Sequence, residues 1–223
     1  NPGDVDSETE WTHTRNIDEI DWTGVDVVLE CTGAFNDGAK ATKHISSGAK
    51  KVVISAPAKN VDKTIVYGVN HEDIAPGDKV ISNSSCTTNC LAPMAMVLHK
   101  EFTIKRGMMT TIHSYTGDQC TVDRRHTDPY RSRTAGMSMI PTSTGLAGKI
   151  EGTAIRVPTP NVSCVDFTFE TDEHISVDDI NHALHTYSKL FMKGILGFEK
   201  APLVSVDYNH TTESCIIAAD QTK

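Results

Sequence analysis

The sequence predicts an α/β domain with a parallel sheet, followed by an α+β domain with a mixed or antiparallel sheet. In the first part, two β-branched runs at residues 25–33 and 50–58 flank residues 36–49, whose composition suits a helix. That strand, helix, strand order is typical of parallel sheets. The later part alternates apolar and polar residues over 161–170 and repeats apolar residues at helical spacing over 176–194. These two patterns are typical of an α+β domain.

The elements of the first part follow from their apolar runs. The two long runs are nearly continuous, which indicates strands that are buried on both faces of the sheet. Ligands of such sheets bind at the carboxyl ends of the strands, here at Thr32, Gly33 and Ser55. Two further short runs, residues 64–69 and 79–82, are expected to extend the sheet.

After residue 83 the pattern changes. Helical spacing predicts helices over residues 91–102 and 176–194, and a Ser-x-x-Asp cap at Ser176 opens the second of them. Further strands are expected at residues 107–113, 161–170, 202–208 and 214–219. The polar side chains of 161–170 fall on one face and the apolar ones on the other, so this strand is expected to cover a core.

Composition excludes several classes of protein. The 223 residues carry a net charge of −8 and are 38% apolar, as expected of a globular protein with a packed core. No apolar run approaches the roughly 18 residues of a membrane span, and the acidic start is unlike a targeting peptide. The negative charge argues against a nucleic-acid surface. We therefore expect a cytoplasmic protein whose six cysteines are reduced thiols.

Cys86 is the first candidate for chemistry. It follows a predicted strand and directly precedes a predicted helix, so its sulfur should lie near the unpaired N–H groups of a helix N-terminus, which favour the thiolate. His113 ends the next predicted strand, and a histidine beside a cysteine at strand ends can form a pair of nucleophile and base. The alternative is a buried, inert thiol, which is the commoner state of a single cysteine.

Cys90 lies one helical turn after Cys86, so the two thiols could share a face of the helix. A metal clip or a redox pair is one interpretation. However, the Cys-x-x-x-Cys spacing without a second Cys or His pair nearby is weak for zinc. Cys90 also begins an apolar stretch of the predicted helix. We therefore favour a structural role for Cys90 and expect no metal site.

Polar residues that suit a phosphate recur in four separate places. They are Ser85 with Thr87, Thr116, Thr144 with Gly145, and Arg156. Hydroxyls, glycine backbone and an arginine together supply the donors that a phosphate needs. Each residue alone is more simply explained as a turn cap or a solvated charge. The set is what indicates a phosphate-bearing ligand.

Five stretches of the chain resemble the phosphorylating glyceraldehyde-3-phosphate dehydrogenase family, in the family's order. They are SNSSCTTNCLAP, TTIHSYTGDQ, SMIPTSTG, RVPTPNVS and KGILGF. The resemblance covers nearly the whole chain. It implies a partial Rossmann-type dinucleotide-binding domain at residues 1–83 and a catalytic domain at residues 84–223. It also implies oxidation of glyceraldehyde 3-phosphate to 1,3-bisphosphoglycerate, with inorganic phosphate as the second substrate.

The family's residue roles carry over by position. Cys86 resembles the nucleophile that adds to the aldehyde and becomes a thioester, and His113 resembles its base. Thr116 and Arg156 resemble the residues that hold the phosphate of the substrate, and Arg131 resembles a further phosphate-contacting arginine. The residues implied around the attacking phosphate are Ser85, Thr87, Thr144 and Gly145.

The resemblance also implies a cofactor and an assembly. The positions similar to the family's cofactor-binding residues are Thr32, Gly33, Phe35 and Ser55. The cofactor implied is NAD, with NADP not excluded. Residues 116–133 resemble the family's S-shaped loop, which packs between subunits, so that a homotetramer is implied.

The chain departs from the family pattern in three places. The first strand of the dinucleotide-binding domain is missing, together with its Gly-rich phosphate turn and the acidic residue that reads the ribose. The stretch between Gly145 and Arg156 is shorter by about three helical turns. The chain also stops before the family's last helix. We expect either part of a longer polypeptide or a truncated protein.

Three other functions stay open at this point. The erythrose-4-phosphate dehydrogenase branch shares the cysteine and histidine motifs but releases an acid without phosphate attack, and retention of Thr144 and Gly145 favours the phosphorylating branch. A truncated remnant would bind a partner without catalysis, although every catalytic side chain is retained. A redox or metal module would rest on Cys86 and Cys90.

Overall fold

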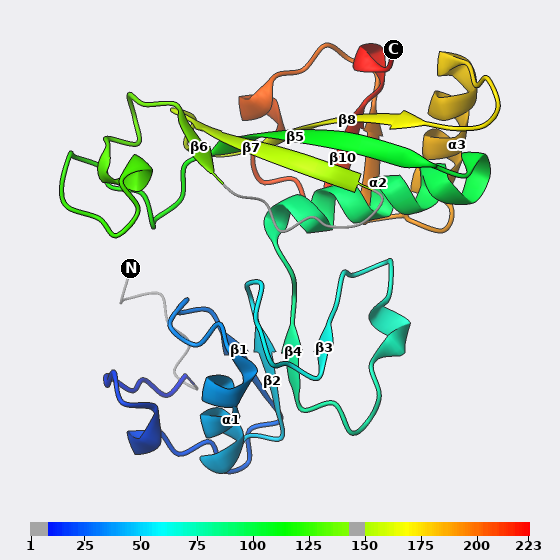
Figure 1. Cartoon of the computed structure of the whole chain (residues 1–223). Coiled ribbons are helices and arrows are strands. Elements are labelled where there is room, and N and C mark those ends of the chain that lie inside the picture. Colours follow the sequence, from blue (N-terminus) through cyan, green and yellow to red (C-terminus); the bar gives the residue numbers. More distant parts are fainter. Residues whose placement is uncertain (1–8, 143–149) are drawn as a thin grey trace. The chain divides into compact units, whose positions relative to one another are not determined.

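The computed structural model describes residues 9–142 and 150–223, and the chain divides into two compact units (Figure 1). The first unit comprises Asn1–Ile65 and Asn70–Ser85, and the second comprises Val66–Val69 and Cys86–Lys223. Each unit has its own hydrophobic cluster of buried residues. Among the described residues, the structure contains no helix with the length and apolar character needed to span a bilayer.

The first unit is built on a four-stranded parallel sheet in the order β1-β2-β4-β3. Its strands are β1 (Val27–Glu30), β2 (Lys51–Ile54), β3 (Lys63–Thr64) and β4 (Val80–Ser82). One α-helix, α1 (Gly38–Ser46), connects β1 to β2, and short 3-10 helices lie at η1 (Ile17–Glu19) and η2 (His71–Asp73). The strand, helix, strand order expected over residues 25–58 is therefore present.

Helix α1 covers one face of this sheet. Its N-cap is Asp37, whose side chain accepts the N–H of Ala39. The buried cluster that it shares with the sheet consists of Val28, Ala41, Ala49, Val52, Ile54 and Val80. On the opposite face of β1, Val27 and Leu29 are 47% and 69% exposed. The expectation of burial on both faces is therefore wrong for β1, because the described residues cover only the α1 side.

The strand expected over residues 64–69 is wrong beyond Thr64. The N–H of Ile65 still donates to the carbonyl of Ser82, but the N–H of Val69 turns back to the carbonyl of Val66. Gly68 has a φ of +81°, which a strand cannot accommodate and which glycine adopts at little cost. The chain therefore leaves the sheet in a turn.

The second unit is centred on a four-stranded mixed sheet in the order β6-β7-β5-β8. These strands are β5 (Arg106–Ser114), β6 (Ile140–Thr142), β7 (Ile150–Val157) and β8 (Cys164–Glu170). Strand β5 runs parallel to β7 and antiparallel to β8. A separate parallel pair is formed by β9 (Leu196–Glu199) and β10 (Cys215–Ala218). The 3-10 helices are η3 (Tyr130–Ser132), η4 (Ser205–Tyr208) and η5 (Ala219–Gln221).

Two helices form the core of this unit with one face of the sheet. Helix α2 (Cys86–Phe102) packs against α3 (Val177–Lys189), β8 and β10. Along β5, Met109 and Thr111 are buried, whereas Met108 is 55% exposed. Phe167 and Phe169 of β8 pack against the cluster, as their alternating pattern predicts. The predicted fold class, a parallel α/β part followed by an α+β part with a mixed sheet, is confirmed.

The strand expected over residues 202–208 is wrong. Residues Ser205–Tyr208 form the 3-10 helix η4 instead. The Asp207 carboxylate accepts the N–H of Val204 at 2.8 Å, so the segment is folded back by a local side-chain bond rather than paired in a ladder. Val204 and Val206 are 62% and 73% exposed, and their apolar character therefore does not report a buried strand.

Helix α3 is preceded by the N-cap Ser176, which forms a complete capping box as the sequence predicts. The Ser176 hydroxyl accepts the N–H of Asp179 at 3.1 Å, and the Asp179 carboxylate accepts the N–H of Ser176 at 2.9 Å. These bonds satisfy N–H groups that the first turn of a helix leaves free. The helix then buries Leu184 and Tyr187 in the core.

Replacing Ser176 with Ala should lower the free energy of unfolding by about 1 kcal/mol, because the cap is lost. Urea denaturation followed by circular dichroism measures the change. Ser214→Ala, at an exposed position of the same unit, serves as the control and should change stability by less than about 0.5 kcal/mol. Equal losses in both variants would show that the cap does not stabilise the unit.

Candidate active site

Cys86 and His113 are brought together inside the second unit. Cys86 is the first residue of α2, and His113 lies near the end of β5. His113 shares the face of β5 that carries Met109 and Thr111, which is the face covered by helices. The Sγ atom of Cys86 lies 3.1 Å from Nε2 of His113. The N-terminus of the helix and the end of the strand therefore deliver a thiol and an imidazole to the same point.

The backbone fixes which imidazole nitrogen carries hydrogen. Nδ1 of His113 lies 2.6 Å from the carbonyl oxygen of Ser114. A carbonyl can only accept, so Nδ1 is the donor. In the neutral ring, Nε2 is then an acceptor that faces the thiol of Cys86. It can take the proton of the thiol and return it as an N–H donor.

The electrostatics of this pair favour the charged forms. The hydrogen bond with His113 lowers the pKa of Cys86 and outweighs burial, while the His113 charge and hydrogen bonds from the backbone and hydroxyl of Thr87 lower it further. The same bond with Cys86 raises the pKa of His113, against burial and the Arg156 charge. These directions favour a thiolate beside an imidazolium, which is the reactive form of a catalytic cysteine.

Arg156 lies next to His113 because β5 and β7 pair in parallel with these two residues in register. Its side chain is only 12% exposed, and Nη1 donates to Oδ1 of Asp118 at 2.6 Å. Its Nε atom is buried and has no hydrogen-bond partner among the described residues. An unpaired buried donor costs about 1–3 kcal/mol, which an incoming acceptor would recover. Arg156 is therefore suited to bind an anion.

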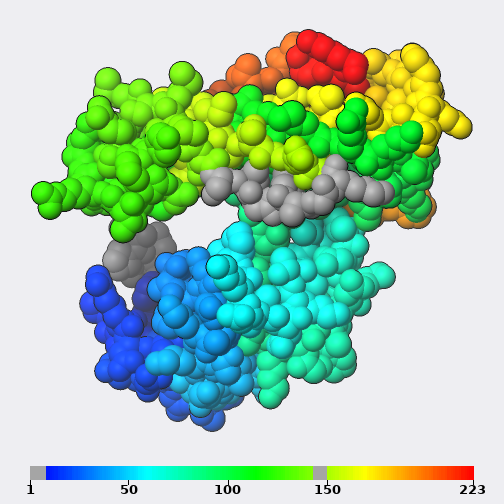
Figure 2. Space-filling view, in the orientation of Figure 1, coloured from blue at the N-terminus to red at the C-terminus, as the bar shows by residue number. Residues whose placement is uncertain are grey.

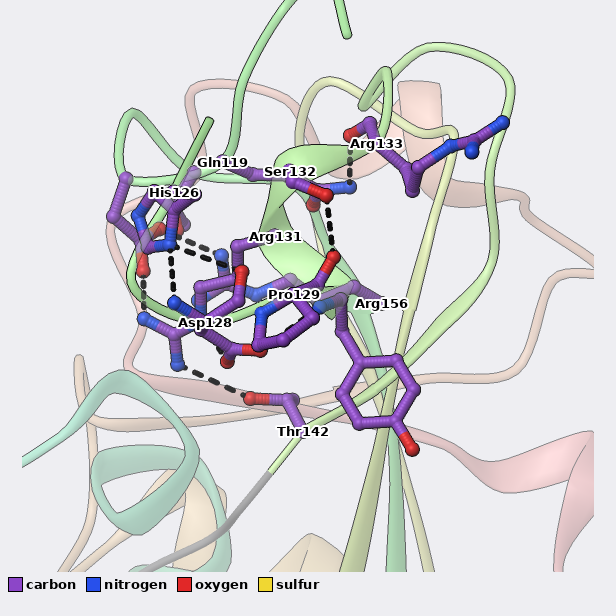
Figure 3. A network of polar contacts seen from close by, with 12 residues as sticks. Gln119, His126, Asp128, Pro129, Arg131, Ser132, Arg133, Thr142 and Arg156 are labelled. Atoms are coloured by element: carbon purple, nitrogen blue, oxygen red, sulfur yellow. Dashed lines mark hydrogen bonds and ion pairs between the residues drawn. The ribbon is translucent and has the colours of Figure 1, made fainter. Parts of the chain in front are cut away.

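Arg131 is more fully engaged (Figure 3). Nη1 forms an ion pair with Asp118, and Nη2 donates to the hydroxyl of Thr142 at 3.3 Å. Nε lies 3.2 Å from Oδ2 of Asp128, an ion-pair distance, although this N–H is not aligned for a hydrogen bond. With two carboxylates beside it, Arg131 has less to offer a ligand than Arg156 has.

Asp118 is a site residue that the sequence reasoning missed. It accepts hydrogen bonds from the Thr116 hydroxyl, Arg156 and Arg131, and so joins three of the residues expected to meet a phosphate. Burial raises its pKa, but the bonds from Thr116 and Arg156 and the charges of the two arginines outweigh burial and lower it. The available signal was its place two residues after Thr116 in a quoted motif. Asp118 was overlooked because the sequence was searched for hydrogen-bond donors to a phosphate, and a carboxylate only accepts hydrogen bonds.

The other residues expected to surround a phosphate are described only in part. Thr87 contacts the sulfur of Cys86 through its N–H and hydroxyl. Ser85 directly precedes Cys86 in the chain. Thr144 and Gly145 lie outside the described residues.

Three of the four residues expected to bind a cofactor share one edge of the first unit. Glu30 of β1 is paired with Ile54 of β2, and the N–H of Ser55 donates to the carbonyl of Glu30 at 3.0 Å. Thr32, Gly33 and Ser55 therefore follow the carboxyl ends of neighbouring parallel strands, and all three are exposed. Gly33 has a φ of +75° and open space where a Cβ would be. This arrangement fits a dinucleotide that lies across strand ends.

Phe35 differs from these three residues. Its ring packs edge-on against the ring of His44, with 5.7 Å between the centroids, and it borders the buried cluster of the first unit. Phe35 therefore anchors the loop after β1 to the buried cluster of the first unit.

Cys90 packs against the hydrophobic cluster of the second unit. Its thiol is a neighbour of the buried Cys215, whose pKa is raised by the hydrogen bond to Cys90 and by burial. In residues 9–142 and 150–223, no group of three or more His, Cys, Asp or Glu side chains is arranged to hold a metal ion.

Cys86 should react with iodoacetamide near neutral pH faster than the other thiols. Cys164 is a useful comparison within the chain, because it is also exposed but burial of its thiol raises its pKa. His113→Asn should slow the labelling of Cys86 and move its pH midpoint upward, since the bond with His113 is the main cause of the lowered pKa. Peptide mass spectrometry measures each rate. Equal rates for Cys86 and Cys164 would contradict the assignment of the pair.

Known proteins match this chain over both of its units. Residues 85–223 match the family model described as glyceraldehyde 3-phosphate dehydrogenase, C-terminal domain. The chain is 50% identical over 223 residues to glyceraldehyde-3-phosphate dehydrogenase of Cereibacter sphaeroides, covering 95% of this chain and 67% of that protein. The corresponding enzyme of Xanthobacter flavus is 53% identical over 211 residues, covering 90% of this chain and 63% of the relative.

A relative from Geobacillus stearothermophilus is 50% identical over 222 residues, covering 93% of this chain and 66% of that protein. The chain thus spans about two thirds of the length of the curated relatives that it matches. The identity extends over both units, and the family model covers the unit that holds Cys86 and His113. The chain belongs to the glyceraldehyde-3-phosphate dehydrogenase family.

Proposed function

We propose that this chain carries the active site of a phosphorylating glyceraldehyde-3-phosphate dehydrogenase. The reaction is the oxidation of glyceraldehyde 3-phosphate to 1,3-bisphosphoglycerate, with inorganic phosphate and NAD or NADP. The observation that carries the proposal is the 3.1 Å contact between Sγ of Cys86 and Nε2 of His113. Arg156 lies beside that pair with a buried N–H that has no partner among the described residues.

The chemistry follows from the protons that this pair can move. The Cys86 thiolate adds to the aldehyde carbon, and Nε2–H of His113 gives its proton to the oxygen that becomes the hemithioacetal hydroxyl. The cofactor, when bound, supplies the acceptor for the hydride that leaves this carbon. His113 takes back the hydroxyl proton as the carbonyl of the thioester forms. An oxygen of inorganic phosphate then attacks the thioester carbon and releases the Cys86 thiolate.

Arg156 and Thr116 are proposed to select the phosphorylated substrate. The guanidinium of Arg156 adjoins His113 on the neighbouring strand, so a phosphate held there keeps the reacting carbon within reach of the pair. Asp118 orients both residues by accepting a hydrogen bond from each. Arg131 is proposed to add positive charge to the same region. Its guanidinium is already engaged by Asp118, Asp128 and Thr142, so it offers the ligand no free pair of donors.

Thr32, Gly33 and Ser55 are proposed to contact the cofactor, because they follow adjacent strand ends and are exposed. Phe35 is proposed to stabilise this loop from the core side. NAD is the proposed cofactor, and NADP is the alternative. Measuring the Kd of each dinucleotide would distinguish the two.

A homotetramer in the cytoplasm is the proposed state of the protein. The segment between β5 and β6, coloured green, protrudes from the body of the second unit (Figure 2). It exposes large apolar side chains, with Val122 at 69%, Met137 at 86% and Met139 at 73% exposure. Such side chains on a protruding segment are suited to contact another copy of the chain.

The direct test is the formation of reduced nicotinamide from glyceraldehyde 3-phosphate and NAD, measured by absorbance with and without inorganic phosphate. Turnover should require phosphate, because phosphate releases the acyl group from Cys86. Cys86→Ser should abolish turnover while circular dichroism shows a folded protein. Turnover to a free acid without phosphate would favour the erythrose-4-phosphate dehydrogenase type of reaction. A folded but inactive wild type would contradict catalysis by this chain.

Replacing Arg156 with Gln should raise KM for glyceraldehyde 3-phosphate about 10- to 100-fold, since a charge-assisted bond contributes about 1.5–3 kcal/mol. Turnover of unphosphorylated glyceraldehyde should change little, because that substrate presents no phosphate. Arg106→Gln is a matched control: Arg106 lies in the same sheet, is 75% exposed and pairs with Glu170. A similar loss with both aldehydes would show that Arg156 does not recognise the phosphate.

A further inference from the structure

A chain of buried polar contacts lies beneath the loop that follows β1. Glu30 and His44 are only 3% and 5% exposed. Oε2 of Glu30 lies 2.8 Å from Nε2 of His44, and the indole N–H of Trp22 donates to Nδ1 of His44 at 3.0 Å. An indole nitrogen can only donate, so Nδ1 must accept and Nε2 must carry the hydrogen. His44 is therefore a neutral ring that donates to the Glu30 carboxylate.

The second oxygen of the carboxylate holds the loop itself. Oε1 of Glu30 accepts the N–H of Thr32 at 2.8 Å and also the Thr32 hydroxyl. The Thr32 oxygen in turn accepts the N–H of Ala34 at 3.1 Å. The ring of Phe35 closes the loop against His44. Every residue from Thr32 to Phe35 except Gly33 is thus tied, directly or through one contact, to the buried Glu30 and His44.

The carboxylate is ionised in this position. Burial raises the pKa of Glu30, but the hydrogen bonds from Thr32 and His44 outweigh burial and lower it. A buried carboxylate with three hydrogen-bond donors is a rigid anchor, because removing any one donor leaves an acceptor without its partner. A loop held this way is ordered before a ligand arrives.

We propose that Glu30 and His44 are positioning residues for dinucleotide binding, which fix the loop of Thr32 and Gly33 in its binding conformation. This inference rests on the proposed function for its cofactor. The Thr32 hydroxyl has already given its hydrogen to Glu30, so this loop offers a ligand mainly backbone groups. The backbone of Gly33 is among these groups, and it is held at a φ of +75°. A small displacement of such a loop costs affinity because its groups no longer converge on the ligand.

Glu30→Gln is the informative change because an amide cannot satisfy this site. The site presents donors on both sides, Thr32 on one and His44 on the other. A glutamine has one accepting oxygen and one donating nitrogen, so one side must place two donors together. The ring of His44 cannot relieve the mismatch by moving its hydrogen, since Trp22 occupies Nδ1 as a donor.

The first measurement is the hydrogen exchange of the Thr32 and Ala34 amides in the full chain without cofactor. Glu30→Gln should speed exchange at both amides at least about tenfold, since their acceptors are displaced. The second measurement is the Kd of NAD by calorimetry, which should rise about tenfold. Thr32→Val, at an exposed position that tolerates the change, should also speed exchange at Ala34.

Asp62→Asn is a matched control in the same unit. The Asp62 carboxylate accepts the N–H groups of Lys79 and Val80, both at 2.8 Å, at the start of β4. Parallel strands place that start at the edge opposite to the loop. Asp62→Asn should leave the Kd of NAD and the loop amides unchanged.

Three results would overturn the inference, and they are distinguishable. Wild-type protein that binds NAD, with Glu30→Gln binding it equally and the loop amides unchanged, overturns the positioning role alone. Wild-type protein that binds neither NAD nor NADP overturns the proposed cofactor and this inference together. An equal rise in Kd for Asp62→Asn would also overturn the positioning role, because the effect would then follow general destabilisation.

Discussion

The parallel pairing of β5 with β7 is the constraint on which the candidate active site depends. It places His113 and Arg156 in register, on neighbouring strands and on the same face. A slip of one residue would exchange Arg156 for Ile155 or Val157, whose side chains point to the other face. The helix-covered face of β5 then brings His113 to Cys86 at the start of α2. The positions of Cys86, His113 and Arg156 relative to one another are thus set by one ladder and one helix.

The arginine side chains around this ladder each lie close to a carboxylate. Arg131 lies between Asp118 and Asp128, and Arg156 shares Asp118 with it. The hydrogen bond between Cys86 and His113 lowers the pKa of the thiol and raises the pKa of the imidazole, so each group favours the charged form of the other. Half-buried charges are tolerated only when they are paired. The buried Nε of Arg131 at least has the Asp128 carboxylate within ion-pair distance, whereas the buried Nε of Arg156 has no partner among the described residues. An unsatisfied donor of this kind is what a ligand can complete.

Sequence patterns predicted the local features well and the long-range ones poorly. The cap at Ser176 and the alternation over residues 161–170 are signals within a few residues of each other, and both are present. Strands β6 and β7 were not predicted, because Pro141 and Gly152 interrupt their apolar pattern. The expected strands over 64–69 and 202–208 failed where a glycine turn and a side-chain cap override β-branched composition. Register, which sets the site, has no signature in one sequence.

The loops that follow β1 and β5 share an arrangement that a search for hydrogen-bond donors overlooks. In the first unit, Thr32 donates to a carboxylate two residues before it, and in the second, Thr116 donates to a carboxylate two residues after it. Each carboxylate is also held by a nitrogen donor from another element, His44 of α1 or Arg156 of β7. An acidic side chain at an anion or dinucleotide site looks unfavourable when ligand contacts alone are considered. It is favourable when it orders the donors, because the entropy of fixing them is then lost on folding and not on binding.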